Sequence, residues 1–244
     1  MSRLAILAGG GALPPRLAKV ATDAVQISFA GAPHDLGSSA EEHRFEKLGT
    51  LFEALKAKGV TDVVMAGAMV RPPLDPAEFD ATMMALAPRL MMAMQGGDDA
   101  LLRLLIAIFE EQGFVMRGAH EIDPSLVACA GVLAGENLSK TQLNDVQRAL
   151  EILNTLSPLD LGQGVVVESG LCLGIETLQG TDALLSFVAA TPQNVRKGTG
   201  VFVKMPKRGQ DLRVDMPTIG PETVRGAVKA GLSAIVIAAG EVLL

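Results

Sequence analysis

Residues 204–220 combine several side chains that can act on a phosphate group. Lysines and arginines, which pair with phosphate, alternate there with two carboxylates, Asp211 and Asp215. Because these aspartates are four residues apart, an extended strand would present both carboxylates on one face. Cations beside paired carboxylates are what a metal-dependent phosphate-ester or pyrophosphate hydrolase requires. A charged strand followed by a turn explains the same pattern without any function. The cations are Lys204, Lys207, Arg208 and Arg213.

The composition limits how a phosphate ligand can be held. The chain has 244 residues, and its hydrophobic fraction of 49% and mean hydropathy of +0.35 are typical of a globular protein with a large core. An aromatic content of 3%, without Trp or Tyr, argues against aromatic stacking as the main way of holding a ligand. The net charge of -6 gives no general attraction to nucleic acid or anionic lipid. Affinity for phosphate must therefore be local, and we expect no nucleic-acid partner.

Three further features bear on the cellular compartment. Cys129 and Cys172 form no CxxC pair, which indicates a reducing compartment and no zinc site. The first ten residues run directly into a strand and a glycine loop, and this leaves no room for a cleaved signal. The apolar stretch 230–239 is too short to span a bilayer. We therefore expect a cytoplasmic protein that is at most peripheral to the inner membrane.

Strands and helices alternate in the first half of the chain. We expect strands at 4–7, 25–29 and 60–65 and an amphipathic helix at 48–58. A glycine follows each of these strands, which is typical of βαβ units in a parallel sheet. Two helices should follow, at about 76–94 and 98–112.

The pattern changes near Gly131. Ser139 is the expected N-cap of a helix that ends at Pro158. Two apolar runs on either side of residues 168–170 indicate a hairpin. We predict an α/β protein of two α/β domains, of which the N-terminal one is Rossmann-like with a parallel sheet. The predicted boundaries are 1–131 for the N-terminal domain, 132–158 for a helical linker and 159–244 for the C-terminal domain.

The glycine loop that follows the first strand is a candidate phosphate site. Gly9, Gly10 and Gly11 lie between a strand and a helix, where backbone N–H groups can cradle a phosphate. A structural tight turn is the alternative. The loop is a poor dinucleotide fingerprint, because Pro14 stands where the third glycine belongs and no acid directly ends the next strand.

Two more candidates lie in the first half of the chain. Gly67 and Arg71 follow a predicted strand, at the sheet edge where α/β proteins bind ligands, although a surface arginine before a proline turn fits equally well. Asp98 and Asp99 fall at a helix start, where carboxylates cap backbone donors without any further function.

Three other loops carry polar groups among glycines or beside a histidine. His120 and Glu121 form a pair that is either a surface feature or part of a site, and no second nearby histidine supports zinc. Gln163, Thr181 and Asp182 lie in glycine-rich loops, where the backbone often approaches a ligand and where turns alone can also explain the glycines.

A methionine-rich helix is expected over residues 83–94. Core packing is the default explanation for such a helix. Adaptable methionine surfaces also suit flexible apolar ligands such as acyl chains.

Taken in order, these motifs resemble one family, the UDP-2,3-diacylglucosamine pyrophosphatases of the lipid A pathway in their α/β form rather than their metallophosphoesterase form. Each motif is weak by itself, but together they run nearly from end to end in the order of the family. The matching segments are residues 7–14, 66–72, 97–103, 118–121, 160–164, 180–184 and 213–220. Family members generally continue by a further helix and strand beyond the residue that matches Leu244.

The resemblance implies Mg²⁺-assisted hydrolysis of UDP-2,3-diacylglucosamine to UMP and 2,3-diacylglucosamine 1-phosphate. It also implies that the N-terminal domain binds the nucleotide and that the C-terminal domain binds the acyl chains and carries the catalytic residue. The essential aspartate of the family corresponds to Asp215, which we predict to be the catalytic residue and, with Asp211, a metal ligand. The predicted substrate-binding residues are Gly10, Gly11, Gly67, Arg71, Asp98, Asp99, His120, Glu121, Gln163, Thr181, Asp182, Lys204 and Arg213.

Two other classes of function remain open at this point. A non-catalytic nucleotide-sugar or lipid-binding module would keep the glycine loops and tolerate the loss of Asp215. An oxidoreductase with a Rossmann half is disfavoured by the irregular glycine loop. For partners, we expect an amphipathic diacyl nucleotide substrate, contact with the inner-membrane surface and, from the apolar composition, a homodimer.

Overall fold

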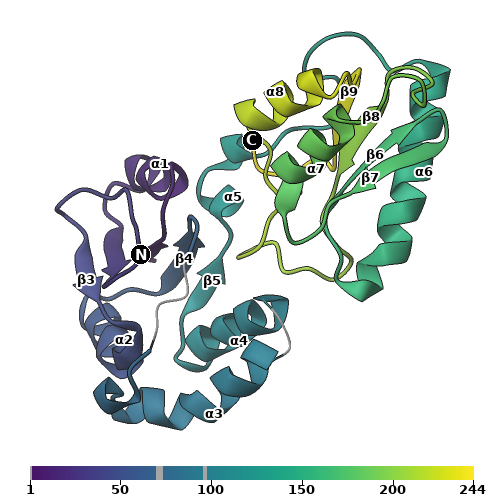
Figure 1. Cartoon of the computed structure of the whole chain (residues 1–244). Coiled ribbons are helices and arrows are strands. Elements are labelled where there is room, and N and C mark those ends of the chain that lie inside the picture. The colour runs from purple at the N-terminus through teal and green to yellow at the C-terminus, as the bar shows by residue number, and fades with distance from the viewer. Residues whose placement is uncertain (1, 70–73, 96–97) are drawn as a thin grey trace. The chain divides into compact units, whose positions relative to one another are not determined.

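The computed structural model describes residues 2–69, 74–95 and 98–244, except for the side chains of Asp98 and Asp99. The chain forms two compact units (Figure 1). The first unit comprises Met1–Pro124 together with Arg213–Asp215, and the second comprises Ser125–Leu212 and Met216–Leu244. Each unit contains its own sheet and helices, which confirms the predicted architecture of two α/β domains.

The first unit is built on a five-stranded parallel sheet with the strand order β3-β2-β1-β4-β5. The carboxyl ends of β1 and β4 are neighbours, because Ala8 pairs with Ala66. Strand β3 is short and polar, and the sequence pattern did not reveal it. The strands are β1 (Leu4–Ala8), β2 (Val25–Phe29), β3 (Glu41–His43), β4 (Asp62–Ala66) and β5 (Val115–Arg117).

The helices of the first unit follow its strands in the expected order. The helix predicted over 76–94 is divided into a 3-10 turn and a longer helix. The helices are α1 (Leu13–Val20), α2 (Leu48–Ala57), α3 (Ala81–Gln95), α4 (Asp98–Glu111) and α5 (Ala119–Ile122), and the 3-10 turns are η1 (Phe45–Lys47) and η2 (Pro76–Glu78).

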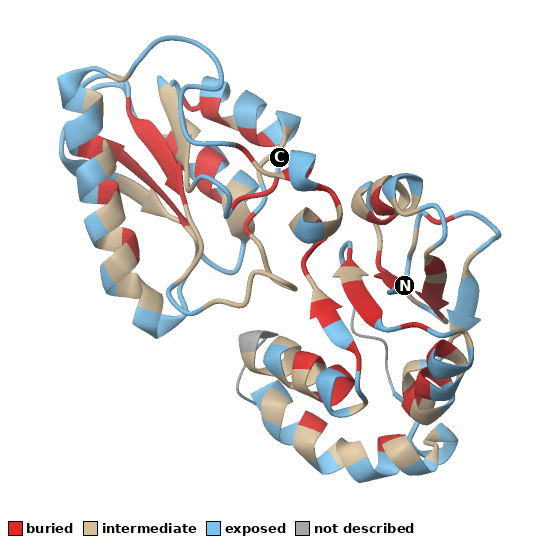
Figure 2. Ribbon diagram, turned by 180° about the vertical axis from the view of Figure 1, so that it is seen from behind, coloured by how far each residue is buried: buried red, intermediate tan, exposed pale blue. Residues whose placement is uncertain are grey.

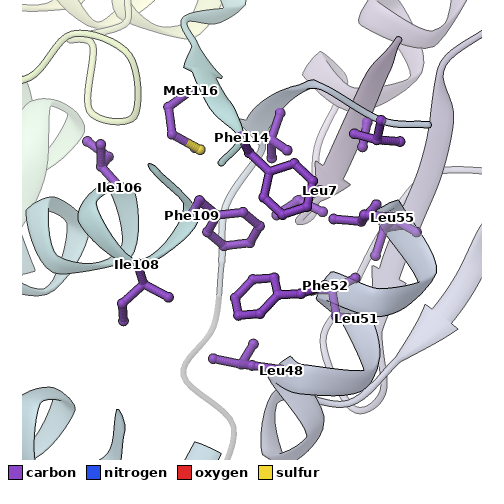
Figure 3. Close-up of a cluster of buried hydrophobic side chains, with 14 of the residues drawn as sticks. Leu7, Leu48, Leu51, Phe52, Leu55, Ile106, Ile108, Phe109, Phe114 and Met116 are labelled. Atoms are coloured by element: carbon purple, nitrogen blue, oxygen red, sulfur yellow. The ribbon is translucent and has the colours of Figure 1, made fainter. Parts of the chain in front are cut away.

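The core of the first unit lies between the sheet and helices α2, α3 and α4 (Figure 3). Phe52 of α2 meets Phe109 of α4 edge to face, with ring centroids 5.1 Å apart, and Phe114 packs beside both rings. Such aromatic pairs add about 0.5–1.5 kcal/mol to the gain from burial. Val214, from the chain segment that follows the second unit's strand β8, packs against the same cluster.

The second unit is built on a four-stranded mixed sheet with the order β7-β6-β8-β9. Strand β6 is antiparallel to both of its neighbours, whereas β8 and β9 are parallel. The predicted hairpin is confirmed, and Ser169 and Gly170 both have positive φ, as a tight two-residue turn requires. The strands are β6 (Gly164–Glu168), β7 (Leu171–Ile175), β8 (Val201–Lys204) and β9 (Ala234–Ile237).

Helices cover both faces of this second sheet. Alternate residues of β6 face opposite sides, so that Val165 packs against α6 while Val166 packs against α7 and α8. Strands β6 and β8 are buried along their whole length, whereas β7 and β9 contain no fully buried residue (Figure 2). The elements are α6 (Lys140–Leu156), α7 (Gly180–Ala189), α8 (Pro221–Lys229) and the 3-10 turns η3 (Pro124–Leu126) and η4 (Ser157–Leu159).

Helix α6 is the helix that was expected within the linker over 132–158. Ser139 caps it as predicted: Gln142 N donates to Ser139 Oγ at 3.3 Å, and Ser139 N donates to Gln142 Oε1 at 2.7 Å. Its residues Ala149 and Leu153 pack against β6 and β8. The structure therefore makes α6 part of the second unit, because its apolar face is buried on the sheet of that unit.

The hairpin turn depends on one buried side chain of α6. The carboxylate of Asp145 accepts from Ser169 N at 2.9 Å and from Gly170 N at 2.7 Å. Asp145→Ala removes both acceptors, and we expect the free energy of unfolding to fall by about 1–3 kcal/mol. Urea denaturation measures this loss. The exposed Glu151→Ala on the same helix is the control, and equal stability of the two variants would contradict the assignment.

Candidate functional site

The two glycine loops of the first unit lock together at the carboxyl ends of β1 and β4. Gly10 N donates to Ala68 O at 2.9 Å, and Ala68 N donates to Gly10 O at 2.8 Å. A Cβ on Gly9 would lie 2.4 Å from Ala68 O, and Gly67 has a φ of +90°. These glycines are thus needed for the close approach of two backbone segments. The N–H of Gly10, expected to contact phosphate, is bonded within the protein.

The remaining backbone N–H group of the glycine loop, that of Gly11, donates to a carboxylate. Gly11 N donates to Asp35 Oδ2 at 2.5 Å, just before the start of α1. An anion fits at this point because the first N–H groups of a helix have no partners within the helix. Sequence reasoning missed Asp35, since it considered only an acid that directly ends β2. The signal was present in the short loop that follows Phe29.

The turn after β5 contains the predicted pair His120 and Glu121. Gly118 N donates to Glu121 Oε1 at 2.8 Å, which closes α5 at its start. The His120 ring folds back over Gly118, where an added Cβ would lie 2.5 Å from its Cε1. Its Nδ1 is buried and has no hydrogen-bond partner among the described residues. The backbone of Arg213 lies beside the same glycine.

An ion pair fixes the end of β5. Arg117 Nε donates to Asp62 Oδ1 at 2.7 Å and Arg117 Nη1 lies 3.3 Å from Glu121 Oε2. Burial acts to raise the pKa of the Asp62 carboxyl, but hydrogen bonds from Thr61 and Arg117 outweigh this effect and the net shift is downward. The Glu121 carboxylate is therefore engaged with backbone and arginine at this sheet edge.

The predicted catalytic residue belongs to the first unit. Arg213, Val214 and Asp215 are grouped with it although they follow β8 in sequence. Val214 packs against the hydrophobic core of the first unit, and Arg213 Nη1 lies 2.7 Å from Glu110 Oε1 of α4. The structure thus brings the predicted residues Arg213 and Asp215 into the same unit as Gly10, Gly67, His120 and Glu121.

The expected pairing of Asp211 with Asp215 on one strand face is wrong. Strand β8 ends at Lys204, and residues 212–214 form a turn. Asp211 belongs to the second unit and Asp215 to the first. Within the described part of the chain, no three His, Cys, Asp or Glu side chains gather in a way that could hold a metal ion.

A buried polar cluster lies at the carboxyl end of β8 in the second unit. Lys204 Nζ donates to Thr181 Oγ1 at 2.6 Å, at the start of α7. Thr181 Oγ1 in turn donates to Glu176 Oε1 at 3.2 Å, and that oxygen lies 3.6 Å from Lys204 Nζ. The Lys204 and Glu176 side chains are only 6% and 10% exposed. Two predicted residues thus meet around a carboxylate that sequence reasoning missed, although Glu176 lies only four residues before Gly180, the start of the 180–184 motif.

Gln163 lies on the loop that leads into the same end of this sheet. Its Nε2 donates to Gln210 Oε1 at 2.9 Å, and its carbonyl accepts from Met205 N at 3.0 Å. Asp182 is exposed in the first turn of α7. Asp182 thus directly follows Thr181 of the cluster in sequence, and Gln163 bonds Met205, the residue after Lys204.

The other two cations of the 204–220 segment bind elsewhere in the second unit. Lys207 Nζ lies 2.5 Å from Asp160 Oδ1. Arg208 donates through its backbone to Ser157 and through Nε to Asn154. These contacts secure the segment near the end of α6. Arg71 lies outside the described residues. Asp98 and Asp99 are the first two residues of α4, but the structure does not describe their side chains.

Comparison with known proteins divides the chain near the same point as the structure. The LpxI N-terminal domain matches residues 3–126, and the LpxI C-terminal domain matches residues 129–244. The chain belongs to the LpxI family. It is also 38% identical over 255 residues to the "UDP-2,3-diacylglucosamine pyrophosphatase LpxI" of Caulobacter vibrioides, an alignment that covers all of this chain and 91% of the relative. The resemblance drawn from the motifs is confirmed.

The interlocked glycine loops give a direct test of the geometry in the first unit. Gly67→Ala places a Cβ 2.6 Å from Gly10 O at a φ of +90°, and we expect a loss of about 1–3 kcal/mol in the free energy of unfolding. Chemical denaturation measures it. Gly37→Ala is the matched control, because an added Cβ there meets no atom within 4 Å. A Gly67→Ala protein as stable as Gly37→Ala would rule out the close approach.

Proposed function

We propose that this chain hydrolyses the pyrophosphate of UDP-2,3-diacylglucosamine, giving UMP and 2,3-diacylglucosamine 1-phosphate in lipid A biosynthesis. One observation carries the proposal: the whole chain aligns at 38% identity with an LpxI-family relative named for this pyrophosphatase activity. In the reaction, water attacks one phosphorus and the bond from that phosphorus to the bridging oxygen breaks. The other phosphate leaves with the electron pair.

Asp215 is the proposed catalytic residue. A carboxylate can orient the attacking water and accept its proton, provided that it is held in one position. Two contacts of neighbouring residues support such positioning. Val214 packs into the core of the first unit, and Arg213 pairs with Glu110. Both contacts restrain the backbone on the N-terminal side of Asp215.

We assign the two halves of the substrate to the two units. The nucleotide is proposed for the first unit, where Gly10, Gly11 and Gly67 line the sheet edge. The diacylglucosamine phosphate is proposed for the second unit, where Lys204 would neutralise phosphate charge. Gln163 and Asp182 are the proposed partners of sugar hydroxyls. The remaining predicted substrate contacts stay predictions.

We also propose that the reaction uses Mg²⁺. Mg²⁺ keeps several waters and is often shared with substrate phosphates, so its site needs few protein carboxylates. Asp215 would hold it, and the role of Asp211 as a second ligand stays a prediction. When bound, the ion would offset the negative charge that develops on the phosphate oxygens.

Because the proposed substrate is a lipid, we also propose that the protein contacts a membrane surface. Among residues 2–69, 74–95 and 98–244, no helix has the length and apolar character needed to cross a bilayer. Helix α3 exposes Met84, Met91 and Met92, whose side chains adapt to acyl chains or to a lipid surface. The expected homodimer stays a prediction.

The test of the proposed function is UMP release from UDP-2,3-diacylglucosamine by the wild type and by Asp215→Asn, each with Mg²⁺ and with EDTA. We expect wild-type turnover that EDTA abolishes. Asp215→Asn should lose about 10³-fold or more in kcat, because it can neither accept the proton nor bind the metal as a carboxylate does. Asp23→Asn, at an exposed position that has no proposed role, is the control, and we expect wild-type kcat.

Three outcomes would contradict parts of this proposal. Near-normal turnover in Asp215→Asn would remove the catalytic role of Asp215. Full activity in EDTA would remove the metal. A folded wild type that binds the substrate but releases no UMP would favour the binding-module hypothesis.

A further inference from the structure

Glu176 is a buried carboxylate that the proposed chemistry does not use. It follows β7, is 8% exposed, and lies between the end of β8 and the start of α7 through its contacts with Lys204 and Thr181. Neither the motif pattern nor the proposed substrate contacts assign it a role. Its neighbours, however, are both predicted substrate-binding residues.

The direction of the hydrogen bonds in this cluster follows from the donors and acceptors that form it. A lysine amino group only donates and an ionised carboxylate only accepts, so the bonds run from Lys204 to Thr181 and from Thr181 to Glu176. The single hydroxyl hydrogen of Thr181 is therefore used, and Thr181 cannot donate it to a sugar hydroxyl. Lys204 uses one of its three hydrogens on Thr181 and keeps two for Glu176 and a ligand.

If this cluster had only a structural role, burying it would lower the stability of the fold. Glu176 Oε2 is buried and has no hydrogen-bond partner among the described residues. An unsatisfied buried acceptor loses its hydration, and buried ion pairs are often no more stable than apolar replacements. Two glycines of the 160–164 motif also make room for this residue. A Cβ on Gly164 would lie 2.5 Å from Glu176 Oε2, and one on Gly162 would lie 2.1 Å from its carbonyl oxygen.

The opposite end of β6 offers a direct contrast. Glu168 is also buried, with 1% exposed against 8% for Glu176, but both of its oxygens have partners: Arg196 Nε at 2.7 Å, Lys197 N at 2.6 Å and Gly198 N at 3.0 Å. That carboxylate ties a loop to the sheet, which is a structural role. Glu176 differs because it leaves one oxygen unpaired while holding a lysine in place.

We propose that Glu176 is a positioning residue, which holds the Lys204 amino group directly and through Thr181 so that its remaining hydrogens reach a phosphate of the substrate. This inference rests on the role of Lys204 in the proposed function. It also explains the glycines of the 160–164 motif, which give space to Glu176 rather than to a ligand. Thr181 accordingly acts on the substrate through Lys204.

A double-mutant cycle on UMP release tests the proposal. The variants are Glu176→Gln, Lys204→Met and the double variant, each checked for folding by urea denaturation. We expect Glu176→Gln to lower kcat/KM about tenfold or more, mainly through KM, because a phosphate is charged in both the ground state and the transition state. In the Lys204→Met background the same change should alter kcat/KM less than about twofold, since its target is already absent.

Two further variants keep the result interpretable. Thr181→Val keeps the side-chain shape but removes the bridging hydroxyl, so a smaller rise in KM is expected even if Glu176→Gln folds poorly. Glu168→Gln is the matched control, and we expect lower stability with an unchanged KM.

Several outcomes would overturn the inference. If Lys204→Met leaves kcat/KM unchanged, both the Lys204 assignment and the positioning role fail. If Lys204→Met lowers kcat/KM but folded Glu176→Gln stays within about twofold of wild type, only the positioning role fails. Additive losses in the double variant would also overturn it. So would a KM increase in Glu168→Gln equal to that in Glu176→Gln, because KM would then simply follow fold stability.

Discussion

Val214 packs against the buried hydrophobic cluster of the first unit, and the position proposed for the catalytic carboxylate depends on that contact. The chain reaches this point after completing β8 of the second unit, so sequence order alone would leave Asp215 there. Apolar burial supplies the free energy that holds the segment, and the Arg213–Glu110 ion pair adds direction but little energy because it is partly exposed. The proposed function therefore relies on a core formed by Phe52, Phe109 and their neighbours.

The local pattern predicted most of the scaffold but could not predict this segment. Alternating strands and helices specified a parallel sheet, and a serine followed by Gln142 specified the start of α6. These features depend on neighbours in sequence. The even spacing of Asp211 and Asp215 predicted a shared strand face, but Gly209 with positive φ and the turn at 212–214 end the extended geometry. Contacts with residues distant in sequence decide whether Val214 packs in the first or the second unit. A local sequence pattern does not reveal such contacts.

The glycine motifs show a related limit of the sequence pattern in locating candidate sites. A glycine that admits a ligand and one that admits another part of the same chain look identical in sequence. In this structure Gly9 and Gly67 admit each other's backbone, and Gly162 and Gly164 admit Glu176. Asp35 and Glu176 went unnoticed for the same reason, since each acts on a residue distant in sequence. The motifs can be found in the sequence, but the atoms that approach their glycines are known only from the fold.

The measurement that tests the account most directly is the kcat for UMP release by Val214→Ala, determined beside its unfolding free energy. Val228→Ala, at an exposed position of α8, is the matched control. If packing of Val214 positions Asp215, kcat should fall about tenfold or more in protein that remains folded, while the control keeps wild-type kcat. A folded Val214→Ala protein with wild-type kcat would contradict the account, because Asp215 would then not depend on the first unit's core.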